Sequence, residues 1–175
     1  IGDCGIVRAL RMIKSEAEIG KITKACIIAG RAFDRVGEIA RAGETLASVF
    51  RRFQMLCLEE GADQVRYLAG GAGPLGYTDV ISPASDAPLQ EGDCLMLDTG
   101  LTRDGYFCDY DRNFAIGKPD ALVRTAHEKL IEATHSGFAA ARPGATAADL
   151  FHAMDKVLTG GEARTDNGRL GHGLG

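Results

Sequence analysis

The chain has 175 residues, of which 45% are hydrophobic and 25% charged, and its formal net charge is −4. This length and composition indicate a globular chain with a sizeable core and exclude a disordered protein. Basic residues do not cluster, which argues against nucleic acid as the main partner. No apolar run approaches the roughly 20 residues of a membrane-spanning helix, and the N-terminal stretch has no signal-peptide core.

Cysteine usage indicates the compartment. The number of cysteines is odd, and no CxxC pair occurs. Paired cysteines are typical of secreted disulfide frameworks, whereas scattered ones are typical of reducing compartments. We therefore expect a cytoplasmic protein with free thiols at Cys4, Cys26, Cys57, Cys94 and Cys108.

Two helices are expected in the first third of the chain. Ser15 and Glu18 have the spacing of a capping box, and apolar residues then recur at helical spacing as far as Val36. Thr45 is a suitable N-cap for the second helix, and Gly61 is a suitable stop.

The middle of the chain is expected to form strands. Residues 65–68 predict a short strand, and residues 70–88 are turn-rich and read as irregular. Residues 94–98 and 106–114 predict the two strands of a hairpin, turned at the sequence TRDG.

Residues 122–141 and 147–158 predict two further helices, and the junction between them repeats an earlier one. IARAGETLASVF (39–50) aligns with AARPGATAADLF (140–151) at a constant offset of 101. The identical pairs include Arg41 and Arg142, Gly43 and Gly144, Thr45 and Thr146, Ala47 and Ala148, and Phe50 and Phe151. Any helix–glycine–helix corner looks somewhat alike, but identities at one offset within matching helices favour an internal duplication.

The duplication defines the expected fold class. The first copy is a helix–helix–sheet unit, and the second stops after its helices. The expected fold is therefore α+β, with a duplicated helix–helix–sheet unit whose second half is incomplete. Because the second copy stops after its helices, we expect the chain to lack the C-terminal part of its domain.

The hairpin carries acidic residues where an interior is expected, because the apolar run LML leads directly into Asp98. If TRDG is a four-residue loop, Asp98 lies opposite Asp109; if the loop is only Asp104 and Gly105, it lies opposite Asp111. Side chains alternate along a strand, so both registers place Asp98 on the same face as Asp109 and Asp111.

Opposed carboxylates need an explanation, because like charges facing each other are destabilising. A solvated face is one explanation, although the LML run favours burial. A salt bridge from Arg112 is a second, but its parity directs it to the other face. A divalent cation is the third, and Asp oxygens suit such ions.

A metal site would also use neutral histidine. His127, His135 and His152 lie in predicted helices and are interpreted as structural or exposed residues. His172 differs, because in RLGHGLG it lies between two glycines, where the backbone can approach closely.

These motifs resemble the pita-bread metallopeptidases: methionine aminopeptidases, Xaa-Pro aminopeptidases, prolidases and creatinase. LRMIKSEAEIGKITKACIIAGRAF resembles the start of their catalytic domain, GDCLMLDTGLTRDGYFCDYDRNFAIGKP their two-Asp ligand hairpin, and RLGHGLG their His-ligand motif. The pita-bread fold is itself a duplicated unit. The resemblance implies that residues 1–14 lead in from an N-terminal domain, and that residues 15–175 form a catalytic domain that lacks its C-terminal part.

The resemblance implies two divalent metal ions (Mn, Co, Zn or Fe), with Asp98 binding one, Asp109 bridging both and His172 binding the other. Two Glu ligands, one of them the general base, would lie beyond residue 175. The implied reaction is cleavage of a peptide or small amide bond by a metal-bridging hydroxide. The implied substrate is a small peptide, with no nucleic acid or membrane partner. Relatives of the prolidase type are often homodimers. We expect the 175-residue chain alone to be inactive.

Two positions depart from the family pattern. Ile81 stands where the family usually has a His that contacts the substrate, and Asp111 stands where it usually has Thr. Asp111 is interpreted as a neighbour that supports Asp109 from outside the ligand set. Two other functions therefore stay open: a metal-dependent enzyme acting on a non-peptide C–N bond, and a non-catalytic binding module of the same fold.

Overall fold

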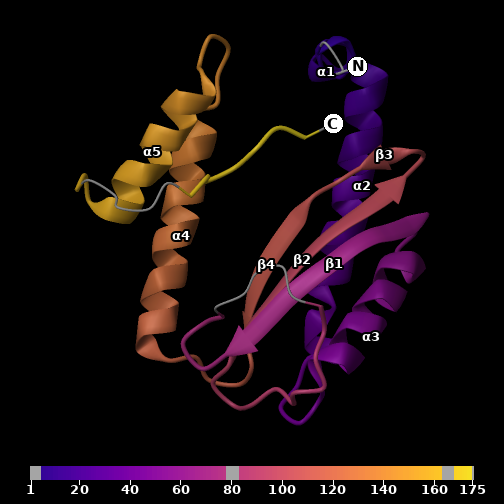
Figure 1. Cartoon of the computed structure of the whole chain (residues 1–175), viewed down its shortest axis with the longest axis vertical. Helices are drawn as coiled ribbons and strands as arrows, with labels where there is room; N and C mark the ends of the chain where they lie inside the picture. Colours follow the sequence, from indigo (N-terminus) through magenta and orange to yellow (C-terminus); the bar gives the residue numbers. More distant parts are fainter. Residues whose placement is uncertain (1–4, 78–82, 163–167, 175) are drawn as a thin grey trace. The chain divides into compact units, whose positions relative to one another are not determined.

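The computed structural model describes residues 5–77, 83–162 and 168–174, and the chain divides into two compact units (Figure 1). The first unit comprises residues 1–119 with 174–175, and the second comprises residues 120–173. No helix of the described residues is long and apolar enough to cross a membrane.

Three α-helices form the helical part of the first unit: α1 (Ile6–Met12), α2 (Glu16–Asp34) and α3 (Leu46–Glu59). The predicted capping box is confirmed, because the Ser15 hydroxyl accepts from the Glu18 N–H and the Glu18 carboxylate accepts from the Ser15 N–H at 2.7 Å. Thr45 is the N-cap of α3, and a short 3-10 helix (Val36–Glu38) follows α2. Helix α1 was not expected from the sequence.

The sheet of the first unit is antiparallel throughout. Strand β1 (Gln64–Gly73) pairs with β2 (Cys94–Arg103), and β2 pairs with β3 (Tyr106–Phe107) and β4 (Tyr110–Ala115). The Cys108 N–H donates to the Leu101 carbonyl at 3.0 Å, so β3 and β4 form one returning strand.

Strand β1 runs five residues beyond the expected end at 68, into the glycines that suggested a loop. Gly70 explains this difference. A Cβ at this position would overlap the Met96 carbonyl and lie 3.1 Å from the Phe50 ring. Glycine therefore lets β1 lie directly against β2 and α3, where a larger residue would force the strands apart.

Helices α2 and α3 pack against one face of this sheet (Figure 1). Leu95, Leu97 and Leu101 of β2 are fully buried in the core with Phe33 of α2 and Phe53 of α3, whose rings lie 4.8 Å apart. The alternate residues of β2 point to the other side of the sheet. Packing of the leucines in the core therefore determines which side chains of the hairpin lie on the other side of the sheet.

The second unit is a helix pair, α4 (Ala121–Ala140) and α5 (Ala147–Thr159). Its described residues include no strand. The corner between these helices repeats the corner before α3, as the sequence predicted. Gly43 and Gly144 have φ values of 91° and 88°. Thr45 accepts from the N–H of Ser48 at 3.1 Å, and Thr146 accepts from that of Asp149 at 3.2 Å.

Candidate metal centre

The hairpin turn decides between the two registers. It is the two-residue turn, in which Asp104 and Gly105 have φ values of 53° and 78°. Both central residues of such a turn have positive φ, which suits Asp-Gly. Asp98 accordingly pairs directly with Asp111, and Asp109 lies two residues before Asp111 on the same side. We call this side of the sheet, with Asp98, Asp109 and Asp111, the carboxylate face.

A tyrosine joins two of the three carboxylates. The Tyr67 hydroxyl lies 2.8 Å from Asp98 Oδ1 and 2.5 Å from Asp109 Oδ1. These two oxygens therefore cannot be farther apart than the sum of the two distances. The expectation that Asp98 and Asp109 share one face is confirmed, although Asp98 lies directly opposite Asp111 and not Asp109.

The sequence did not identify Tyr67, because its place beside the carboxylates depends on how β1 pairs with β2. In β1 it pairs with Gly100, two residues after Asp98, so strand parity places it on the carboxylate face. Gly100 makes room for it, because a Cβ there would overlap the rings of Tyr67 and Phe107. The glycine of the DTG motif thus lets an aromatic residue lie beside the acidic pair.

The electrostatics of the face follow from these contacts. Partial burial, and then the hydrogen bonds to Asp109 and Asp98, hold the pKa of Tyr67 far above its usual value. Tyr67 is therefore a proton donor at any physiological pH. Asp111 is solvent-exposed, yet enough protein surrounds it that desolvation, followed by repulsion from Asp98, raises the pKa of its carboxyl.

Arg112 does not lie between the carboxylates. Its guanidinium lies 4.6 Å from the centre of the Tyr110 ring and donates to the backbone carbonyl of Asp111 at 2.6 Å. This agrees with the parity argument against a salt bridge. Asn113, the residue after Arg112, accepts a hydrogen bond from the Tyr77 hydroxyl at 2.9 Å.

The histidines lie in the second unit. His172 is exposed, and its Nδ1 lies 3.0 Å from the carbonyl of Gly173. His127 and His135 are exposed on α4, and His152 makes an edge contact with Phe151. The structure thus gathers three acidic residues in one unit and places His172 in the other. Ile81 lies outside the described residues.

The donor set suits a hard divalent cation only in part. Two carboxylates converge on one hydroxyl, and carboxylate oxygens are the ligands such ions prefer. Among the described residues, no group of three or more His, Cys, Asp or Glu is arranged to hold an ion. The carboxylate face therefore offers two converging carboxylates, but the described residues do not form a complete metal site.

Comparison with solved structures defines the fold. The prolidase of Pyrococcus horikoshii superposes with a TM-score of 0.86 at 29% identity, over 97% of this chain and 49% of that one. Dipeptidase PepE of Mycobacterium ulcerans superposes with a TM-score of 0.81 at 33% identity, over 87% of this chain and 41% of that one. The chain has the pita-bread fold of these proteins, as the sequence predicted.

Sequence comparison defines the family. The profile of metallopeptidase family M24 matches residues 20–175, and the chain belongs to this family. It is 37% identical over 172 residues to a probable dipeptidase PepE of Mycobacterium tuberculosis, covering 97% of this chain and 46% of that protein. It is 30% identical to an Xaa-Pro dipeptidase of Pyrococcus horikoshii, covering 97% and 49%. The chain spans about half the length of these relatives.

Proposed function

We propose that this chain is part of a dinuclear-metal hydrolase that cleaves peptide or small amide bonds, similar to Xaa-Pro aminopeptidases and prolidases. Membership of the M24 family supports the reaction class. The observation that carries the proposal is that Asp98 and Asp109 converge on the hydroxyl of Tyr67. The opposite side of the same strands packs in the core, and this packing fixes the strand register.

Asp98, Asp109 and His172 would hold the ions, with Asp109 contributing to both. Two facing carboxylates repel each other, so a cation near them removes a cost that the fold otherwise bears. When bound, divalent ions such as Mn, Co, Zn or Fe polarise the scissile carbonyl and lower the pKa of water.

Tyr67 orients the two carboxylates. Its hydroxyl has one proton, which both carboxylate oxygens share as acceptors, and its raised pKa keeps that proton in place. A fixed donor restrains the rotation of both side chains, so their remaining oxygens stay on the carboxylate face. Groups outside the ligand set often contribute to metal affinity in this way.

Asp111 keeps an alternative reaction open. It pairs directly with Asp98 and adds a third carboxylate to the face, where the family usually has Thr. This extra charge is the observation that favours a metal-dependent enzyme acting on a non-peptide C–N bond. A cationic amidine would be better matched to three carboxylates than a neutral peptide.

We also propose a compartment, a substrate and an oligomeric state. The cysteines described as free are Cys26, Cys57, Cys94 and Cys108, which supports a reducing compartment and hence the cytoplasm. A small peptide or amide is the proposed substrate. A homodimer is proposed by similarity to prolidases.

Metal content and turnover of the full protein test the proposal. The wild-type protein, loaded with Mn or Co, is expected to hydrolyse Xaa-Pro dipeptides. Asp109→Ala should lose both ions and all turnover, because its carboxylate is shared. Asp111→Ala should lose only about 10–100-fold in metal affinity, as expected of a residue outside the ligand set.

Elemental analysis of both variants decides the assignment. Equal metal loss in the two variants would show that Asp111 is itself a ligand. A wild-type protein that binds metal but cleaves amidines and not dipeptides would establish the alternative reaction. A wild-type protein that binds no divalent metal would refute the proposal and favour a binding module.

A further inference from the structure

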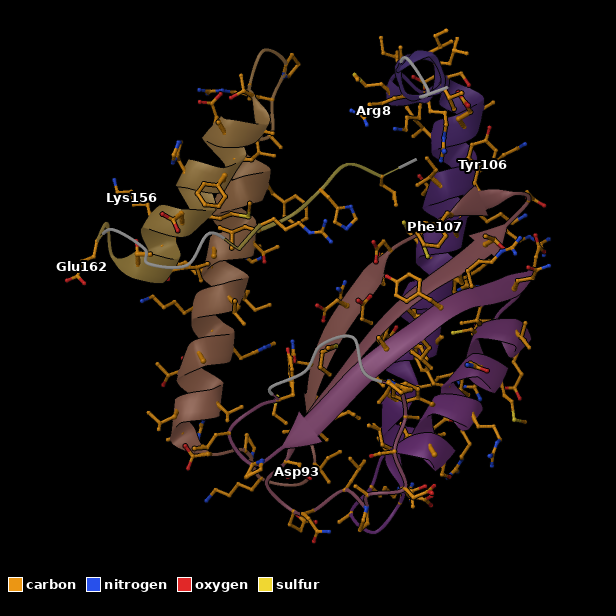
Figure 2. The ribbon with its side chains drawn as sticks, in the orientation of Figure 1. Arg8, Asp93, Tyr106, Phe107, Lys156 and Glu162 are labelled. Atoms are coloured by element: carbon orange, nitrogen blue, oxygen red, sulfur yellow. The ribbon has the colours of Figure 1, made fainter. Side chains whose placement is uncertain are left out.

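Phe107 is the aromatic side chain of the returning strand that lies on the carboxylate face. It pairs with Thr102 of β2, two residues before Asp109, so the two side chains leave the strand on the same side. In Figure 2 the Phe107 ring lies in front of the sheet, on the side away from α2. Tyr106, its neighbour in β3, points the other way, and its hydroxyl donates to Glu18 of α2 at 3.1 Å.

The ring of Phe107 is held in place by its neighbours. It occupies the space above Gly100, where a Cβ would overlap it. Its centroid lies 6.2 Å from that of the Tyr67 ring, with an angle of 32° between the planes. Because the Tyr67 hydroxyl is bonded to Asp98 and Asp109, the ring of Phe107 has a fixed position beside the acidic pair.

Phe107 is nevertheless only half-buried. The apolar residues of β2 on the same face, Cys94 and Met96, are 8% and 2% exposed. A partly exposed phenyl ring next to polar groups leaves apolar surface in contact with water, which is unfavourable. A ligand group that covers the ring would recover this free energy.

We propose that Phe107 is a specificity-determining residue, whose ring forms an apolar wall for a bulky apolar group of the substrate. This inference rests on the proposed function and assigns to Phe107 the contact with an apolar group of the substrate next to the bond that is cleaved. The wall adjoins the carboxylates through Tyr67, so a group packed on it would also exclude water from the reacting bond.

The apolar group could come from the residue before the bond or from the residue after it. Two pairs of dipeptides separate these sources. Leu-Pro against Gly-Pro varies the first residue, and Leu-Pro against Leu-Gly varies the second. One pair should show the preference of the wild-type protein, and Phe107→Ala should reduce that preference about tenfold, the scale on which apolar contacts discriminate substrates.

Matched variants separate this role from a structural one. Phe107→Leu retains an apolar side chain at the same position, so it should retain part of the preference. Tyr106→Leu makes the same change on the opposite side of the same strand and should leave the preference unaltered. Metal content should stay at the wild-type level in Phe107→Leu, because Tyr67 still holds Asp98 and Asp109.

Steady-state kinetics of the full, metal-loaded protein measure the preference as a ratio of kcat/KM values. A lower ratio in Phe107→Ala, with normal metal content and a raised KM, supports the inference. An unchanged ratio in an active Phe107→Ala overturns it. A lower ratio in Tyr106→Leu of the same size also overturns it, because the effect would then come from the strand and not from the ring.

A binding measurement keeps the inference testable without turnover. If the metal-loaded wild-type protein cleaves no dipeptide, the proposed function fails, and calorimetry of Leu-Pro and Gly-Pro still reports on Phe107. Leu-Pro binding that weakens about tenfold in Phe107→Ala supports the wall. Equal binding by wild-type and variant, or no binding by either, overturns it.

Discussion

The two helix corners of the chain are similar in sequence and in local geometry, but they differ in what they bury. Their glycines agree closely in φ. Their N-cap threonines accept the same hydrogen bond, from the N–H three residues later. Helix α3 buries six residues against the sheet, whereas α5 buries none and α4 buries only Ala133 and Gly137. The corner is therefore encoded locally, while burial depends on the sheet, and the sheet also creates the carboxylate face.

The largest expected effect comes from the phenylalanines at matching positions of the repeat. Phe50 is 6% exposed in the core, whereas Phe151 is half-buried in the helix pair. Phe50→Ala should lower the free energy of unfolding by about 3–5 kcal/mol, because it removes a buried ring and leaves a cavity. Phe151→Ala should cost about 1 kcal/mol. Urea unfolding followed by circular dichroism measures both. Similar losses would show that the two helix pairs are equally buried in solution.

The second largest loss of stability is expected at the carboxylate face. Tyr67→Phe removes the hydroxyl that Asp98 and Asp109 share and leaves the two charges opposed. We expect a loss of about 1.5–3 kcal/mol at neutral pH, the range for hydrogen bonds to charged groups. Tyr106→Phe is the matched control, because its hydroxyl donates to one carboxylate, Glu18, at the surface, and it should cost less than about 1 kcal/mol. Equal losses in urea unfolding would mean that Tyr67 does not restrain the pair.

The N-cap threonines of the two corners should contribute equally to the free energy of unfolding. Thr45→Ala and Thr146→Ala each remove one hydroxyl that accepts from the N–H three residues later. Each should cost about 1 kcal/mol, the typical value for an N-cap. Differential scanning calorimetry of both variants checks this. A cost at Thr45 several times that at Thr146 would mean that burial, and not local geometry, sets the strength of the cap.

The smallest expected effect is a pH dependence at the two capping boxes. The backbone N–H of Ser15 lowers the pKa of Glu18 from 4.5, and that of Thr146 lowers the pKa of Asp149 from 3.8. A lowered folded-state pKa stabilises the protein above the unfolded value, and this stabilisation is lost as the pH falls through the folded value. On acidification the Glu18 contribution should therefore fall first, below about 4.5, and the Asp149 contribution below about 3.8.

Acid titration of the stability of Glu18→Gln and Asp149→Asn checks this order. Each variant should lose the part of the pH dependence that belongs to its own box. The same pH profile in both variants as in the wild-type protein would contradict a role for either carboxylate in capping.

Much of the fold could be predicted from local sequence, because caps and turns are set by a few neighbouring residues. Ser15 with Glu18, and Thr45, gave the helix starts correctly. The end of β1 could not be predicted, because Gly70 belongs to the strand only through its contacts with Met96 and Phe50, which are far away in the sequence. Helix α1 was missed because its apolar residues, including Leu10, are exposed and show no core-facing pattern.

The face on which the acidic residues lie could be predicted from the sequence, but the residues that they contact could not. Strand alternation placed Asp98, Asp109 and Asp111 on one face, whichever turn formed. Which acid lies opposite Asp98 depended on the turn, and TRDG is compatible with both lengths. Tyr67 could not be assigned because its contact joins β1 to two other strands, and pairing between distant strands is not written in any one of them.

The two-residue turn at Asp104 and Gly105 limits how this hairpin can change in length during evolution. Lengthening the turn by two residues at the expense of the strands slides the pairing but keeps all three carboxylates on one side. A shift of one residue exchanges the two sides of the returning strand, so Asp109 would enter the core and Cys108 would face outward. Relatives with functional carboxylates at these positions should therefore differ in turn length in even steps, or compensate an odd step with a bulge.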